Sequence, residues 1–184
     1  MPSASTKPIV AISGSTSATS RTAKLLARVV ADVEGRGYKV ETIRVRDLPA
    51  EDLVQARFDS LPLQEATAKV EGARAIIVAT PIYKAAYSGI LKAFLDVLPQ
   101  FGLAQKTVLP LATGGTIAHV LAIDYALRPV LNSLGARHIV PGLFVLDKSL
   151  ALTDDGGVLP DEATQKMLDG IVGAFLESIA AFER

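Results

Sequence analysis

After a short polar segment, the chain opens with a run of apolar residues that does not alternate with polar ones. Residues 8–13 are Pro-Ile-Val-Ala-Ile-Ser, and this short β-branched run is typical of a strand buried on both faces of a parallel sheet. A loop follows. Apolar residues then recur at helical spacing from Ala23 to Val33, until Gly35 and Gly37 end the helix. This part of the chain therefore predicts a strand, a loop and a helix.

The alternation of strand and helix continues along the rest of the chain. Further strands are expected over residues 39–45, 75–79, 107–112 and 137–146. Further helices are expected near 63–70, over 89–98, over 117–134 and after Asp161, which is placed as an N-cap. Five strands alternating with helices predict an α/β fold, in which helices cover both faces of a doubly wound parallel sheet in three layers. Ligands of such sheets bind beyond the carboxyl ends of the strands, so we expect the site in the loops after Ser13, Ala79 and Ala112.

Length, charge and composition narrow the function classes. The 184 residues, 49% of them hydrophobic, suit a single domain over residues 1–184, with a flexible terminus at residues 1–7. The 19 basic and 19 acidic residues balance, which argues against nucleic acid as a partner. No cysteine is present, so thiol redox chemistry is excluded and a redox reaction requires a borrowed cofactor. The sequence has neither a signal-peptide pattern nor an apolar stretch of roughly 20 residues, which predicts a cytoplasmic protein outside the membrane.

The loop after the first strand is rich in hydroxyl groups and leads directly into a helix. It runs from Gly14 to Thr22, with Arg21 at its helical end. Free amides at a helix N-terminus, the helix dipole, the hydroxyl groups and the guanidinium together favour a phosphate. The lysine of the nucleoside-triphosphate loop and the three glycines of the dinucleotide fingerprint are missing, so a monophosphate is favoured. The alternative is a solvated turn in which serine and threonine only cap the helix.

Two later loops complete the expected crevice. Residues 80–89 combine a proline, aromatic rings and small residues, and Pro81 restricts the backbone that would face a planar ligand. Residues 113–116 are Thr-Gly-Gly-Thr, which allows the main chain to approach a ligand closely. Each loop could also be an ordinary connection between a strand and a helix. Neither His119 nor His138 has partners at the spacing of a metal site, so no metal is expected.

Several stretches resemble the NAD(P)H-dependent FMN reductases of two-component alkanesulfonate monooxygenase systems. The similarity runs from about Val10 to Phe144 and is carried by residues 51–53, 56–60, 79–89, 108–116, 118–119, 124–127 and 129–131. It implies a flavodoxin-like fold with an FMN site. On this resemblance, the FMN phosphate is held by Ser15, Ser20, Arg21 and Thr22. The isoalloxazine and ribityl are expected to be lined by Pro81, Ile82, Tyr83, Thr113, Gly114 and Gly115.

The same resemblance implies the reaction and its participants. FMN is expected as a substrate or exchangeable cofactor and NADPH as the reductant, with NADH as a second candidate. The reduced flavin would pass to an FMNH2-dependent sulfonate monooxygenase. Hydride transfer between two stacked rings requires no protein acid, base or nucleophile, so no catalytic residue is assigned. Tyr125 matches a family tyrosine at a subunit interface, where a bulky insertion is associated with a π-bulge and with flavin exchange, and a homo-oligomer, dimer or tetramer, is expected.

Two other functions are compatible with the sequence. Related flavodoxin-like reductases of quinones, chromate or azo compounds share the first loop and keep FMN tightly bound. A flavin electron carrier without enzymatic activity is the second alternative, although such carriers are usually strongly acidic and this chain is neutral. Residues 147–160 are rich in turn-forming residues and are expected to form a solvated loop.

Overall fold

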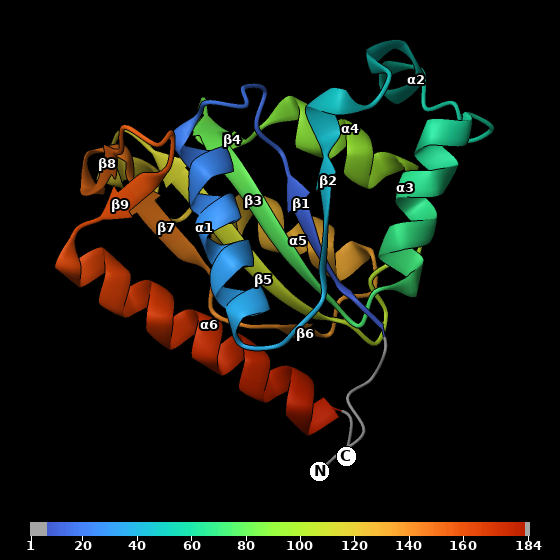
Figure 1. Ribbon diagram of the computed structural model, residues 1–184. Helices are drawn as coiled ribbons and strands as arrows, with labels where there is room; N and C mark the ends of the chain where they lie inside the picture. The colour runs from blue at the N-terminus through green and yellow to red at the C-terminus, as the bar shows by residue number, and fades with distance from the viewer. Residues whose placement is uncertain (1–6, 183–184) are drawn as a thin grey trace.

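A parallel sheet between two layers of helices forms the body of the protein, as described by a computed structural model for residues 7–182 (Figure 1). Apart from residue 7, the terminus that we expect to be flexible lies outside the described residues. The main strands lie side by side in the order β2-β1-β3-β5-β6. They are β1 (Ile9–Ser13), β2 (Val40–Arg44), β3 (Ala75–Tyr83), β5 (Thr107–Gly114) and β6 (His138–Ile139). All their pairings are parallel, which confirms the predicted doubly wound α/β sheet.

Side chains of β1 alternate between two hydrophobic cores. Ile9 and Ala11 join a core on the face covered by α1 (Arg21–Gly35) and α6 (Glu162–Phe182). Val10 and Ile12 join the core on the opposite face, which is covered by α3 (Leu61–Gly72), α4 (Gly89–Val97) and α5 (Arg128–Ser133). Because both faces of β1 are buried, the strand needs no polar positions, and this accounts for its uninterrupted apolar sequence.

Capping side chains set where the helices begin. The Oγ of Ser20 accepts a hydrogen bond of 3.1 Å from the amide of Ala23 at the start of α1. At α6, the carboxylate of Asp161 accepts one of 2.8 Å from the amide of Thr164, so the predicted N-cap is confirmed. These side chains satisfy amides that have no partner within the helix.

The fifth strand is interrupted rather than continuous over residues 137–146. Its two parts, β6 and β7 (Leu143–Leu146), both pair with β5. Pro141 between them has no amide hydrogen to donate to the sheet. Gly142 lies so close to its neighbours that a Cβ there would be 2.8 Å from the Cγ2 of Ile123. The ladder is thus interrupted at Pro141 and Gly142, where the chain passes close to Ile123.

The structure also corrects the helix expected over residues 117–134. It is divided into a short 3-10 turn (Ile117–His119), a π-helix η3 (Ile123–Leu127) and α5. Short elements that the sequence pattern did not reveal are η1 (Val45–Asp47) and α2 (Ala50–Val54). Among the described helices, none combines the length and the apolar character that a bilayer crossing requires.

Residues 147–160 do not form the solvated loop that their composition predicts. After a 3-10 turn (Asp147–Ser149), the antiparallel strands β8 (Leu150–Leu152) and β9 (Val158–Pro160) form a hairpin beside α1 (Figure 1). Leu150 and Val158 are buried in the core shared with α1 and α6. Leu150 and Val158 hold the hairpin against the helix, whereas Ala151, Leu152 and Leu159 are exposed together with residues 154–156 of the turn.

Candidate functional site

Three segments meet at the carboxyl edge of the sheet, where the topology predicts a ligand site. The amide of Gly14 donates to the carbonyl of Ala79 over 2.8 Å, and the Oγ of Ser88 donates to the carbonyl of Gly14 over 2.5 Å. The hydroxyl groups of Thr22 and Thr113 lie 2.6 Å apart. The first loop is thus hydrogen-bonded to both of the others.

The loop after β1 is shaped by its own serines. Ser15 is buried, and its Oγ lies 2.5 Å from the Oγ of Ser20 and donates to the carbonyl of Ser17 over 3.0 Å. Ser20 in turn caps α1. The buried Ser15 therefore fixes the position of the Ser20 side chain through this hydrogen bond. The Ser20 hydroxyl itself stays at the partly exposed surface of the loop.

The same loop carries several backbone amides that no described residue engages. The amides of Thr16, Ala18, Arg21 and Thr22 have no acceptor among the described residues. Arg21 is exposed, and its Nε donates to the carbonyl of Leu150 over 3.2 Å, so the hairpin holds its stem beside the loop. Unengaged amides at a helix N-terminus and a guanidinium form a donor set that fits a phosphate group.

Thr22 is almost fully buried, although it belongs to the loop that is expected to bind the phosphate. Thr22 and Thr113 are 2% and 3% exposed, and their hydroxyl pair joins the start of α1 to the end of β5. In such a pair one hydroxyl donates and the other keeps its proton for a further acceptor. The pair can therefore hold two elements together and still donate to an anion.

The segment after residue 79 continues the sheet instead of forming a loop. Pro81 and Ile82 are buried within β3, and Tyr83, at its end, is 52% exposed. A tight hairpin leads to β4 (Ala86–Tyr87), with φ of +49° at Lys84 and +66° at Ala85. Two side-chain-bearing residues in the left-handed region make this turn strained, and such strain is concentrated at functional sites.

The two glycines after β5 differ in their surroundings. A Cβ on Gly114 would lie 2.9 Å from the Cζ of Phe144, so this glycine is required by packing. A Cβ on Gly115 would meet only the Oδ2 of Asp147, at 3.9 Å. Gly115 is exposed, and its backbone is open to a ligand. Of this pair, the structure therefore leaves Gly115 as the one that can approach a ring directly.

Tyr125 lies in the π-helix η3, so the π-bulge expected at this position is present. Its side chain is 79% exposed, and Ile117 and Leu121 nearby in the chain are 63% and 52% exposed. The π-helix packs against β4, next to the hairpin after β3. An apolar surface thus adjoins the site on the side of the third loop.

Ser88 and Thr80 are the site residues that the sequence analysis missed. Both are buried, the amide of Ser88 donates to the Oγ1 of Thr80 over 3.0 Å, and the Ser88 Oγ caps α4. The signal available in the sequence was a serine directly before a helix. Nearby in β4, burial raises the pKa of the Tyr87 hydroxyl, which keeps it protonated.

Comparisons with known proteins show the family of this chain and support its fold. Residues 8–151 match the family described as NADPH-dependent FMN reductase. An FMN reductase (NADPH) of Pseudomonas putida is 48% identical over 159 residues, covering 86% of this chain and 80% of the relative. The NADH-dependent FMN reductase SfnE of Pseudomonas putida is 33% identical over 147 residues, covering 78% of each chain. The solved apo form of an NADH:FMN oxidoreductase (EMOB) has a TM-score of 0.85 and 45% identity, covering 94% of this chain and 90% of that chain.

The Thr22–Thr113 pair generates a prediction about stability. Thr22→Val should lower the free energy of unfolding by about 1 to 3 kcal/mol, because it leaves the buried hydroxyl of Thr113 without its partner. In urea unfolding, the double variant Thr22→Val/Thr113→Val should lose less than the sum of the two single variants. Thr42→Val, at an exposed position of β2, is the control. Strictly additive losses would show that the two hydroxyls do not interact.

Proposed function

The chain belongs to the family of NADPH-dependent FMN reductases, and we propose that it reduces FMN as an exchangeable substrate and supplies the reduced flavin to a cytoplasmic monooxygenase. The observation that carries the proposal is the donor set of the first loop, which suits a single phosphate group. FMN carries one terminal phosphate. When bound, the flavin supplies an acceptor for the hydride of NADPH, with NADH as an alternative reductant.

Each segment of the site has a distinct part in this proposal. Ser20, Arg21 and the free amides hold the phosphate, Ser15 positions Ser20, and Thr22 contributes through its hydroxyl pair. The ring and ribityl would be lined by the ends of β3 and β5, namely Pro81, Ile82, Tyr83, Thr113, Gly114 and Gly115. Because stacked rings exchange a hydride directly, the protein acts by binding and orienting them, and no side chain is assigned as catalytic.

The exposure of the site supports release of the flavin. Tyr83 is 52% exposed, and Gly115 and Thr116 also lie at the surface. A ring held at such a rim keeps one face toward solvent and can leave without unfolding of the core. The partner that we infer is an FMNH2-dependent sulfonate monooxygenase, supported by the resemblance carried by residues 79–89 and 108–116.

The apolar surface beside the site supports self-association. Tyr125, Ile117 and Leu121, within nine residues of one another in the chain, are all exposed, and exposed apolar side chains that cluster in this way mark protein interfaces. We infer a homo-oligomer, a dimer or tetramer, in which Tyr125 lies at the interface. Because this patch adjoins the third loop, association at it would also change access to the flavin.

Flavin retention and acceptor preference test the proposal. The purified protein should lose FMN during gel filtration and should oxidise NADPH faster with added FMN than with a quinone. Steady-state rates with FMN, FAD, riboflavin, NADPH and NADH define the substrates. Retained FMN together with a preference for quinones would instead indicate a quinone reductase, and no NADPH oxidation with FMN would contradict both functions.

Arg21 provides a test of the phosphate site. Arg21→Ala should weaken FMN binding by about 1.5 to 3 kcal/mol, because a charge-assisted hydrogen bond is lost, whereas Ser20→Ala should cost about 0.5 to 1.5 kcal/mol. Quenching of flavin fluorescence on binding measures both. Arg28→Ala is the matched control, since Arg28 lies on the same helix but donates to Gln165 of α6. An unchanged FMN affinity of Arg21→Ala would refute this assignment of the loop.

Tyr125 links assembly to flavin exchange in this proposal. Tyr125→Ala removes the most exposed of the three apolar side chains Ile117, Leu121 and Tyr125, and should shift the molecular mass in light scattering toward smaller species. The same variant should change the fraction of FMN retained during gel filtration. The control is Met167→Ala, which removes an exposed apolar side chain from a different element, the helix α6. A Tyr125→Ala protein with unaltered mass and unaltered flavin retention would exclude this role.

A further inference from the structure

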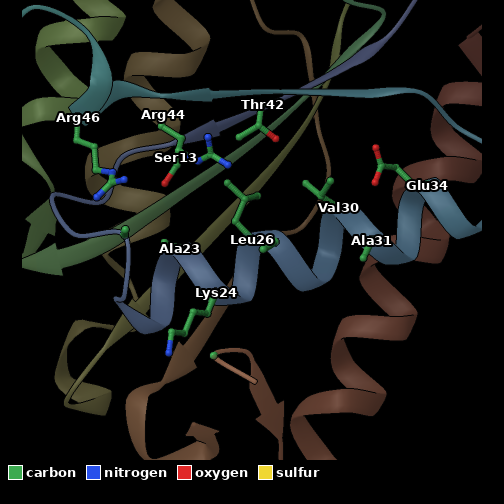
Figure 2. A pocket seen from close by; sticks show the side chains of 13 residues that line it. Ser13, Ala23, Lys24, Leu26, Val30, Ala31, Glu34, Thr42, Arg44 and Arg46 are labelled. Carbon is green, nitrogen blue, oxygen red and sulfur yellow. The ribbon is translucent and has the colours of Figure 1, made fainter. Parts of the chain in front are cut away.

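A groove of about 540 Å3 lies between α1 and the edge strand β2 (Figure 2). It is next to the site formed by the first loop and the ends of β3 and β5, but outside it. It exists because α1 turns small side chains, such as Ala23, Ala27 and Ala31, toward this side. Leu26 and Val30 provide the rest of the apolar wall. The groove therefore offers an apolar surface at the edge of the sheet.

Positive charge is concentrated at one end of the groove. Arg44 and Arg46 extend from β2 and from the turn after it toward the N-terminal half of α1 (Figure 2). Arg44 is exposed and has no hydrogen bond or ion pair with any described residue. Arg46 contacts only its exposed neighbour Asp47, at 3.3 Å. Neither guanidinium group forms an ion pair with Glu34, the acidic residue among those that line the groove.

The acidic residue of the groove lies at its other end. Glu34 is ten positions beyond Lys24 along α1, about 15 Å farther along the helix axis. Lys24 itself extends toward the β8–β9 turn that carries Gly156, away from the two arginines (Figure 2). The electrostatic character of the β2 end is therefore set by Arg44 and Arg46 together.

This end of the groove is adjacent to the first loop. Ser13 and Ala18, which begin and line that loop, also line the groove, and Ser13 is directly paired with Arg44 in the sheet register. Three strand spacings separate β2 from β5, about 14 Å at the usual distance between neighbouring strands. A dinucleotide whose nicotinamide lies at the ends of β3 and β5 can span this distance with its pyrophosphate linkage.

We infer that this groove binds the adenosine end of NADPH, with Arg44 and Arg46 on its 2′-phosphate. The inference rests on the proposed reduction of FMN by NADPH. It adds which residues would make the protein bind NADPH more tightly than NADH. The apolar wall suits the adenine ring, and paired guanidinium groups suit a phosphate dianion. NADH has a hydroxyl in place of that phosphate and gains nothing from the arginines.

The relatives show that coenzyme choice varies within this fold. The Pseudomonas putida relative at 48% identity is described as an NADPH enzyme, whereas EMOB at 45% identity is described as an NADH enzyme. Choice between the two must therefore depend on a few side chains and not on the architecture. Arg44 and Arg46, outside the flavin site but next to it, are in the position where such side chains are needed.

The test compares Arg44→Ala, Arg46→Ala and the double variant with the unaltered protein. Steady-state rates with saturating FMN should show kcat/KM for NADPH falling about 10- to 100-fold more than that for NADH, mainly through KM. Arg44→Lys should restore part of the NADPH preference because it keeps the charge. The double variant Arg28→Ala/Arg36→Ala removes the same charge elsewhere on the surface and serves as the control.

A binding measurement without turnover separates the groove from the flavin reaction. With FMN saturating the first loop, calorimetry should detect adenosine 2′,5′-bisphosphate binding to the unaltered protein, and the double variant should lose it. Adenosine 5′-monophosphate should bind weakly to both. Equal losses for NADPH and NADH, no loss for either, or unchanged bisphosphate binding would each overturn the inference. Absence of NADPH oxidation by the unaltered protein would instead count against the proposed function, while the bisphosphate titration would still decide the groove.

Discussion

The hydrogen bonds that join the first loop to its two neighbours are the constraint on which the site depends. The Gly14 amide is bound to the Ala79 carbonyl, the Gly14 carbonyl to Ser88, and Thr22 to Thr113. These contacts are buried, so breaking one leaves a polar group without water or partner. They hold three segments from distant parts of the chain in one arrangement, while four amides of the first loop have no acceptor among the described residues.

This arrangement separates a rigid base from an exposed rim. Ser15, Thr80 and Ser88 are buried and serve to position other groups, whereas Tyr83, Gly115 and Tyr125 lie at the surface. A phosphate on the first loop, which the base positions, and a ring at the rim would be bound by separate groups. That division is consistent with a flavin that binds in a defined place and still exchanges with solution.

The sequence predicted the larger elements well because their signals are local. The apolar run of residues 8–13, the helix ended by glycines and the capping Asp161 all correspond to observed elements. It failed where contacts between distant residues override local pattern. The fifth strand is interrupted where Gly142 passes close to Ile123, and the pairing of Tyr83 with Ala86 converts an expected loop into a strained hairpin. The hairpin of residues 150–160 forms because Leu150 and Val158 pack on a core built from α1 and α6.

By itself, the sequence determined the α/β alternation, the three segments that meet at the carboxyl edge of the sheet and the hydroxyl-rich loop, since each depends on residues close together in the chain. Only the tertiary structure decided what those residues do to one another: that Ser15 braces Ser20, that Thr22 joins Thr113, and that Gly114 is required by Phe144. It also placed Arg44 beside Ser13, across the sheet. Such pairings arise from strand register and helix packing, which bring together residues that no local spacing relates.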